Sequence, residues 1–308
     1  MNPPTKSAFD DGMGILNGII GDYLQQKGNP LATEMGFYHQ GQPIVLSAEN
    51  LKKIHPTPRR KVCVLVHGLT NTESIWRFKE TPHLDYGKLL EQDAEFTPLY
   101  VRYNSGLAVE TNGQLLTRLL ESLIQTYPHG IDELILMGFS MGGLLIRSAN
   151  HMASKSPEKF SWAEKVKRSV YIGTPHQGAA LEHLGYWATR ATKAVPKEYV
   201  QVIGDLLATR SQGIQDMRHG KIAEGGEDIL HFSPQQTHYF ISGEMIGSNK
   251  NHWLSKFLGD GLVNRDSAHA RQLIPDGVSG ESCHFEGLGH LALARSPKVY
   301  TQLKEWLA

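Results

Sequence analysis

The chain has 308 residues, of which 40% are hydrophobic and 20% charged, proportions typical of one large globular α/β domain or of one domain with an insertion. Lysine and arginine together number 31, as do aspartate and glutamate, and no basic stripe is present, which argues against a nucleic-acid-binding protein. No stretch approaches the roughly 18 apolar residues of a membrane helix, so no membrane span is expected.

The expected compartment is the cytoplasm. Residues 1–6 do not place a charged region before an apolar one, as a secretory signal would. Cys63 falls inside an apolar strand and Cys283 in a late loop or strand, and two cysteines form no disulfide framework. Both features favour a reducing environment.

The first predicted element is a helix near the N-terminus. Apolar residues recur at helical spacing within residues 13–24, at Met13, Leu16, Ile20 and Leu24. Glycines in the same stretch weaken a helix, because glycine loses the most conformational freedom on folding. We expect this helix to pack on the domain; the alternative is that it docks on a membrane or on a lipid substrate.

A β-hairpin is predicted over residues 36–47. Its turn is expected near residues 40–42, where a glycine lies between two glutamines. The hairpin would form the antiparallel edge of a larger sheet, so that residues 1–60 add a helix and a hairpin edge to the core. Residues 55–60, which contain two prolines, link this part to the main body.

The main body alternates predicted strands with predicted helices. The continuous apolar run 62–66 indicates a strand buried on both faces, as in a parallel sheet. Further strands are expected at 96–103, 134–137, 166–172, 239–242 and 283–286, and helices at 114–127, 143–151 and 296–307. This alternation predicts an α/β fold with a mostly parallel central sheet flanked by helices, whose core comprises residues 61–178 and 234–308.

Residues 179–233 interrupt the alternation. They contain two helix-like segments, 181–193 and 198–209, and no clear strand. An insertion between two core strands, beside the ends that carry an active site, is typical of a helical cap or lid. The alternative is an ordinary pair of surface helices.

A short motif within residues 138–143 predicts a nucleophilic serine. Ser140 lies in a Gly-x-Ser-x-Gly sequence between an expected strand and an expected helix, the context of a nucleophile elbow. Gly138, Gly142 and Gly143 leave room for the close backbone approach that such a tight turn requires. The free N–H groups at the start of the helix would favour negative charge beside Ser140.

A nucleophilic serine requires a base and an acid, which in this chain order follow it. His290 lies in a glycine-lined loop directly before the last predicted helix, the position expected for the base. Asp260 lies between two glycines after the 239–242 strand and is the preferred acid. Glu244 and Asp266 remain alternatives for the acid.

The oxyanion that forms during acyl transfer requires preorganised hydrogen-bond donors. One is expected to be the backbone N–H of Met141, which follows the nucleophile. The other is expected from the loop after the 62–66 strand, at Leu69. His67, in the same loop, is predicted to hold the loop through hydrogen bonds rather than to act as a base. The loop 173–178 is likewise predicted to pack under the site, with no catalytic role for His176.

No cofactor or metal is expected. Four histidines of the second half lack the i, i+4 spacing with a carboxylate that marks a common zinc motif, namely His183, His219, His231 and His238. No loop resembles a calcium site. Asp205, Glu224 and Asp228 are expected to be solvated surface charges.

Together these motifs resemble the lipase/esterase branch of the α/β-hydrolase superfamily, including bacterial lipase-like proteins and the α/β domain of GPI inositol-deacylase-like proteins. The resemblance covers residues 60–308 and is carried by the segments 67–69, 138–143, 173–178, 259–261 and 289–290. It implies a triad of Ser140, Asp260 and His290, with Leu69 and Met141 as oxyanion donors. Residues 1–60 match no segment of the family, and the absence of a secreted lipase's leader argues against an extracellular triglyceride lipase.

The function predicted from the sequence is that of a serine carboxylic-ester hydrolase, an esterase or lipase that acts on apolar esters through an acyl-enzyme intermediate. An acyltransferase or thioesterase would use the same triad, and a non-catalytic binder on a hydrolase scaffold is the alternative of another class. The expected partner is a small-molecule or lipid ester, and peripheral contact with lipid stays open. The acyl length, the alcohol and the oligomeric state are left open.

Overall fold

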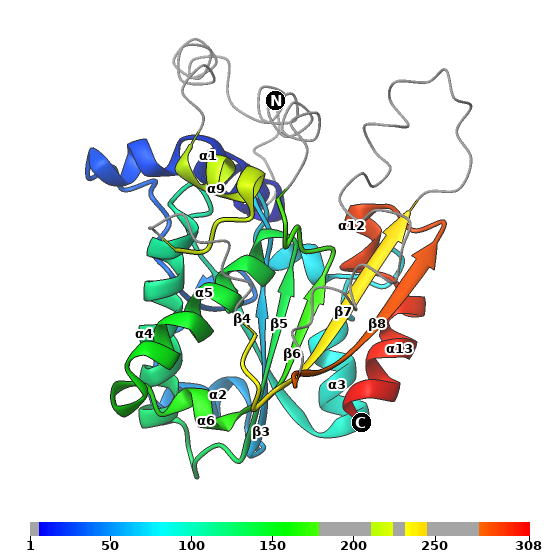
Figure 1. Ribbon diagram of the computed structural model, residues 1–308. Helices are drawn as coiled ribbons and strands as arrows, with labels where there is room; N and C mark the ends of the chain where they lie inside the picture. The colour runs from blue at the N-terminus through cyan, green and yellow to red at the C-terminus, as the bar shows by residue number, and fades with distance from the viewer. Residues whose placement is uncertain (1–5, 179–210, 224–231, 245–276) are drawn as a thin grey trace.

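A central sheet of eight strands organises the residues that the computed structural model describes, 6–178, 211–223, 232–244 and 277–308 (Figure 1). Its strands lie in the order β2-β1-β4-β3-β5-β6-β7-β8. Their bounds are β1 (Gly36–His39), β2 (Gln42–Pro43), β3 (Lys61–Val66), β4 (Phe96–Arg102), β5 (Glu133–Phe139), β6 (Val166–Ile172), β7 (Thr237–Glu244) and β8 (Ser279–Glu286). All neighbours from β4 to β8 are parallel, whereas β1 is antiparallel to both β4 and β2.

This architecture confirms the predicted α/β-hydrolase fold with its mostly parallel sheet. The hairpin of β1 and β2 turns at Gln40 and Gly41, both with positive φ, and forms the antiparallel edge. The central strands β3 and β5 are apolar and buried after their first residues, Lys61 and Glu133. Strands of this kind are stable only where helices cover both faces of the sheet.

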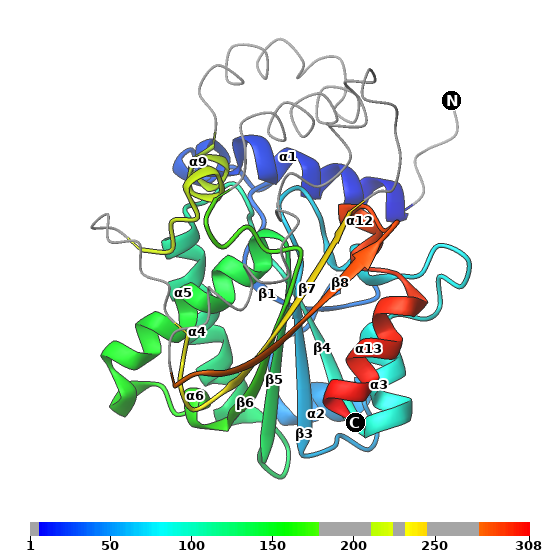
Figure 2. The same ribbon diagram turned by 45° about the vertical axis from the view of Figure 1, so that its right-hand side comes forward.

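The sheet separates two apolar clusters because successive side chains of a strand point to opposite faces. In β3, Val62, Val64 and Val66 belong to one cluster, and Cys63 and Leu65 belong to the other. The first cluster is covered by α4 (Val109–Thr126), α5 (Met141–Lys155) and α6 (Trp162–Lys165). The second is covered by α3 (Tyr86–Ala94), α12 (His290–Leu293) and α13 (Pro297–Leu307) (Figure 2).

The helices differ from the sequence prediction in extent. Helix α4 begins at Val109, five residues earlier than expected, and the glycine at 113 lies inside it against Ser148 of α5. Two short helices, α2 (Ala48–Ile54) and α3, were not expected. Each has a side-chain cap, since Ser47 Oγ accepts from Asn50 N at 3.2 Å and Asp85 Oδ1 accepts from Lys88 N at 2.9 Å. Such caps satisfy N–H groups that a short helix leaves open.

Helix α1 (Lys6–Gln26) runs across the carboxyl ends of the strands (Figure 2). It is longer than the predicted 13–24, and Ile20 departs from helical geometry with φ −127° and ψ 18°. Its apolar residues form a small cluster of their own, comprising Ile15, Ile19, Ile20 and Leu24. This helix therefore lies over the carboxyl ends of the strands, where α/β enzymes place their ligands.

Most of the predicted cap, residues 179–233, lies outside the described residues, and the cap stays a prediction. Within it the structure describes residues 211–223, which include α9 (Gln212–His219), and residues 232–233. Ser211 Oγ donates to the carbonyl oxygen of Gly18 in α1 at 2.9 Å, and Val109 N donates to Asp216 Oδ2 at 2.9 Å. The described part of this region thus packs against α1 and α4.

Candidate active site

Ser140 occupies the turn between β5 and α5. Its φ of 53° and ψ of −122° lie in a region that residues with a side chain rarely adopt. The turn is held from the neighbouring strand, because Ser140 N donates to the carbonyl oxygen of Ile172 at 2.8 Å. A strained residue that the surrounding structure holds in place is a common feature of functional sites. The geometry is that of a nucleophile elbow.

The glycines of the motif permit the strand and helix to meet. A Cβ on Gly138 would lie 2.5 Å from the backbone nitrogen of Gly143, and a Cβ on Gly142 would collide with the carbonyl oxygen of Val66 in β3. No side chain fits at either position. Helix α5 therefore begins directly over the ends of β3 and β5, and the N–H of Met141 belongs to its first turn, whose donors have no partner within the helix.

Residues 67–72 form a loop, called the 67–72 loop below. This loop lies against the turn at Ser140, called the serine turn. A Cβ on Gly68 would lie 2.9 Å from Cβ of Ser140, so the two segments are in direct contact. Leu69 follows at 1% exposure. Of the two expected oxyanion donors, Leu69 therefore follows a residue that contacts Ser140, and Met141 follows Ser140 itself.

His290 is the first residue of α12, just after β8. Its ring centroid lies 4.8 Å from that of Phe139, the residue before the serine, and the ring also rests on Gly173. The last strand and the nucleophile strand are separated by β6 and β7 in the sheet, yet the loop after β8 reaches back over both. The base predicted from the sequence is therefore placed beside the serine turn.

The predicted acid, Asp260, lies outside the described residues, as does Asp266. Glu244 is the last residue of β7 and pairs with Glu286 of β8 in the sheet. A Cβ on the preceding Gly243 would lie 2.6 Å from the carbonyl oxygen of Leu288, two residues before His290. Strand β7 therefore ends beside the loop that carries His290, and the identity of the acid stays a prediction.

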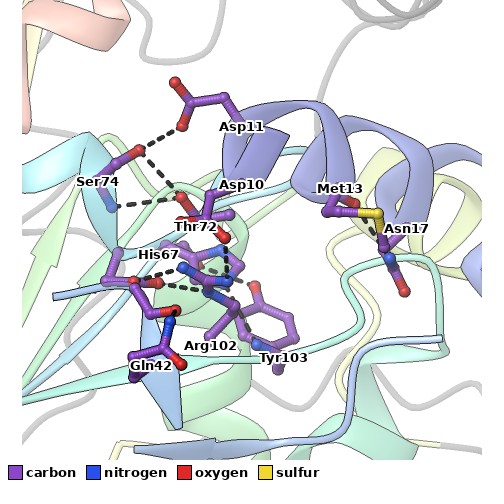
Figure 3. A network of polar contacts seen from close by, with 12 residues as sticks. Asp10, Asp11, Met13, Asn17, Gln42, His67, Thr72, Ser74, Arg102 and Tyr103 are labelled. Carbon is purple, nitrogen blue, oxygen red and sulfur yellow. Dashed lines mark hydrogen bonds and ion pairs between the residues drawn. The ribbon is translucent and has the colours of Figure 1, made fainter. Parts of the chain in front are cut away.

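His67 uses both ring nitrogens to hold the 67–72 loop. Nδ1 lies 2.8 Å from the carbonyl oxygen of Gly68 and donates to it, while Nε2 lies 3.3 Å from the backbone nitrogen of Tyr103 and accepts from it. The Tyr103 hydroxyl donates to the carbonyl oxygen of His67 at 2.9 Å, and the two rings stack with centroids 4.3 Å apart (Figure 3). Burial lowers the pKa of His67 to about 3. These contacts favour the predicted loop-holding role over that of a base.

Replacing His67 by asparagine, which retains a donor near the Nδ1 position, should make the protein less sensitive to acid. Native His67 stays neutral down to about pH 3, whereas the unfolded chain takes up a proton below about pH 6.5, so stability falls as the pH drops through this window. The free energy of unfolding of the wild type should therefore lose about 2 kcal/mol more than that of His67→Asn between about pH 7 and pH 5. Urea denaturation at both pH values measures this difference.

The exposed His83 provides a matched control, because it lies on the surface loop before α3. His83→Asn should leave the pH dependence of unfolding at its wild-type value. An equal pH dependence in His67→Asn and the wild type would contradict the neutral, buried state assigned to His67.

Gly173→Ala should lower kcat by about a hundredfold by displacing the His290 ring. Gly173 has a φ of 59°, and a Cβ there would lie 2.9 Å from both Nδ1 and Cε1 of His290. Gly130→Ala is the matched control, since Gly130 also has a positive φ, 75°, but has no atom within 4 Å of an added Cβ. Steady-state kinetics with a chromogenic ester compare the two, and equal losses would show that only backbone strain matters.

A buried arginine beneath the site was not predicted from the sequence. Arg147 of α5 is 1% exposed, places Nη1 3.3 Å from the carbonyl oxygen of His176, and stacks 5.0 Å from the ring centroid of Phe232. Burial lowers the pKa of Arg147 to about 10, which still leaves it protonated at neutral pH. Burial and then the charge of Arg147 lower the pKa of His176. The signal in the sequence is that Arg147 carries the first charge after Glu133.

No group of three or more histidine, cysteine or acidic side chains able to hold a metal ion is present among the described residues. Within the same residues, no helix combines the length and the apolar character required to cross a lipid bilayer. The arrangement around Ser140 combines a serine, an imidazole and backbone N–H groups, which are groups that nucleophilic acyl chemistry uses.

Comparison with known proteins adds a family match. The family model described as "Putative serine esterase (DUF676)" matches residues 57–215, which include the 67–72 loop and Ser140 but not His290. No curated protein matches the sequence.

Several solved structures are similar over most of the chain. An α/β hydrolase fold protein from Chitinophaga pinensis is 14% identical with a TM-score of 0.48, covering 82% of this chain and 90% of that one. A hyperthermophilic esterase from the archaeon Pyrobaculum calidifontis is 17% identical with a TM-score of 0.48, over 81% and 77%. A thermophilic esterase from Thermogutta terrifontis with malate bound is 17% identical with a TM-score of 0.46, over 82% and 90%.

Proposed function

The chain belongs to this serine esterase family, DUF676, and from that membership we propose that it is a carboxylic-ester hydrolase that acts on apolar esters through Ser140. The support lies at the ends of β3, β5 and β8. There the serine turn, the 67–72 loop and the ring of His290 are packed against one another. A serine as nucleophile, an imidazole as base and two backbone N–H groups as oxyanion donors can together carry out acyl transfer.

In the first half of the reaction, the Ser140 hydroxyl attacks the ester carbonyl. His290 accepts the hydroxyl proton as general base, and Asp260 orients His290 and stabilises the imidazolium that forms. The carbonyl oxygen becomes an oxyanion, which accepts hydrogen bonds from the N–H groups of Met141 and Leu69. Collapse of this intermediate breaks the ester bond, and His290 returns the proton to the departing alcohol.

In the second half, water replaces the alcohol. His290 removes a proton from a water molecule, which attacks the acyl-serine carbonyl, and the same two N–H groups stabilise the second oxyanion. The acid product leaves and Ser140 regains its proton. The preference for apolar esters is supported by the side chains around the serine, since Leu69, Phe139 and Met141 are all buried and apolar.

A single observation carries this proposal: the imidazole of His290, more than a hundred residues along the chain from Ser140, rests on the residue directly before the serine. The loop after β8 must pass β7 and β6 to reach β5, so the fold brings this histidine to the serine from a distant part of the chain. The contact supports a joint role for the serine and the imidazole.

Labelling with a fluorophosphonate tests the proposal. The reagent should modify the protein with one label per chain, and peptide mass mapping should place the label on Ser140. The labelled protein should lose hydrolysis of p-nitrophenyl esters in proportion to the label incorporated. Labelling elsewhere, or full ester hydrolysis after complete labelling of Ser140, would refute it. Adding a primary alcohol to the assay would show whether acyl transfer competes with hydrolysis.

A further inference from the structure

Helix α1 contacts the body of the protein through a glycine face. A Cβ on Gly14 would lie 2.8 Å from the carbonyl oxygen of Asn71, and a Cβ on Gly18 would lie 2.5 Å from Cγ2 and 2.8 Å from the backbone nitrogen of Thr70. Side chains do not fit in such gaps, so the helix backbone rests directly on residues 70 and 71. The glycines that weaken the helix as an isolated element are thus what allows it to approach the 67–72 loop.

Polar contacts fasten the start of α1 to the segment after this loop. Arg102, at the end of β4, donates Nη1 to Asp10 of α1 at 3.0 Å and binds Glu73 with two nitrogens, Nε at 2.6 Å among them. Ser74 Oγ donates to Asp11 at 2.6 Å. Figure 3 shows both aspartates directed from the helix toward these residues. The Arg102 guanidinium is largely buried, where a two-pronged ion pair with carboxylate is far more directional than a surface pair.

The 67–72 loop is held on its other side by the serine turn and the 104–106 segment. Gly68 lies against Ser140, and Thr70 N donates to Ser105 Oγ at 3.1 Å. Thr70 has a φ of 60°, unusual for a residue with a branched side chain. A conformation of this kind persists only where its surroundings enforce it. Gly18 of α1 contributes to that enforcement, because it contacts the backbone of Thr70 itself.

We propose that α1 is a positioning element of the active site: it holds Thr70 in its strained conformation and thereby aims the N–H of Leu69 at the oxyanion. The inference rests on the proposed function. The N–H of Leu69 lies in the peptide plane that joins Gly68 to Leu69, and the carbonyl oxygen of that plane accepts a hydrogen bond from Asn71 N at 3.2 Å. Because α1 rests on Thr70 and Asn71, a shift of α1 moves Asn71 N and so changes the direction of the Leu69 donor. Since the oxyanion exists only in the transition state and the intermediates, disturbing α1 lowers kcat and leaves KM nearly unchanged.

Two glycine substitutions in α1 separate this role from general effects on the helix. Gly18→Ala adds a methyl group that must push α1 and Thr70 apart, and it should lower kcat about ten- to a hundredfold. Gly12→Ala adds the same methyl group in the same helix at a position with no atom within 4 Å, and it should leave kcat within about twofold of the wild type. Rates are expressed per active site, as counted by fluorophosphonate labelling.

A trifluoromethyl ketone supplies a readout that a merely structural role would not move. Ser140 adds to its carbonyl, the hydroxyl proton passes to His290, and the adduct carries an oxyanion on the same donors. Its inhibition constant should rise in Gly18→Ala by the same factor by which kcat/KM falls, while KM stays within about twofold. A fall in active-site number with unchanged kcat per site would overturn the proposal, as would equal kinetics in Gly18→Ala and Gly12→Ala.

A variant without steric clash covers the case in which Gly18→Ala fails to fold. The double variant Asp10→Asn and Asp11→Asn keeps side-chain volume but removes the charges that face Arg102 and Ser74. It should lower kcat at least about threefold and raise the inhibition constant of the ketone by a similar factor. Wild-type values of both quantities would overturn the proposal. Failure of the proposed function is distinguishable, because it would appear in the wild type as absence of labelling at Ser140.

Discussion

Ser140→Ala is expected to lower kcat for ester hydrolysis by roughly 10⁴- to 10⁶-fold while the protein stays folded. The substitution removes only the hydroxyl that attacks the carbonyl. Alanine and serine have the same Cβ, so the strain of the turn, with its φ of 53°, is unchanged. The proposed oxyanion donors, the backbone N–H groups of Met141 and Leu69, remain, and we expect them to supply the residual rate. Chromogenic ester assays at high enzyme concentration measure the loss, and thermal unfolding checks the fold.

Ser154→Ala is the control for this experiment. Ser154 lies on the same helix but is exposed, and its hydroxyl donates to the carbonyl oxygen of His151 at 2.8 Å. This control should retain wild-type kinetics. If Ser140→Ala kept more than about a tenth of the activity, the nucleophile would have to be another residue and the proposed mechanism would fail.

The parallel core could be predicted because its signals are local. A continuous apolar run such as 62–66, in a chain that alternates such runs with helical patterns, has few alternatives to a buried strand in an α/β sheet. The serine motif was predictable for the same reason, because Gly138 permits a close approach to Gly142 and Gly143 within the motif itself. The prediction of His290 as the base rested only on the chain order of such triads and on the place of His290 before the last helix.

The remaining features depend on contacts that no local pattern encodes. The role of the glycines in α1 is set by the 67–72 loop, some fifty residues later, so the sequence alone suggests only a weak helix. Arg147 packs with His176 and Phe232, which come from two other segments. Thr70 has a positive φ where it contacts α1 and Ser105, although a β-branched residue predicts the opposite. Tertiary packing decides such positions.

The acid that supports His290 is the residue whose assignment rests on sequence reasoning alone. The acid must lie on a loop past a core strand and turn its carboxylate toward the imidazole. Asp260 follows β7 in the chain and is flanked by glycines, which permit a tight loop. Asp266 follows Arg265, and an ion pair with Arg265 or Arg271 on the surface is the simpler role predicted for it. Glu244 ends β7 in register with Glu286 of β8.

Asp260→Asn should therefore lower kcat by roughly 10²- to 10⁴-fold with little change in the melting temperature. Asparagine keeps the volume of aspartate but removes the charge that stabilises the imidazolium and favours the wrong tautomer of His290. Asp266→Asn is the matched control and should change kcat by less than about threefold, as expected for the loss of a surface ion pair. Glu244→Gln should behave like the control. If Asp266→Asn or Glu244→Gln instead showed the large loss, and Asp260→Asn the small one, the catalytic acid would be the residue whose substitution is more damaging.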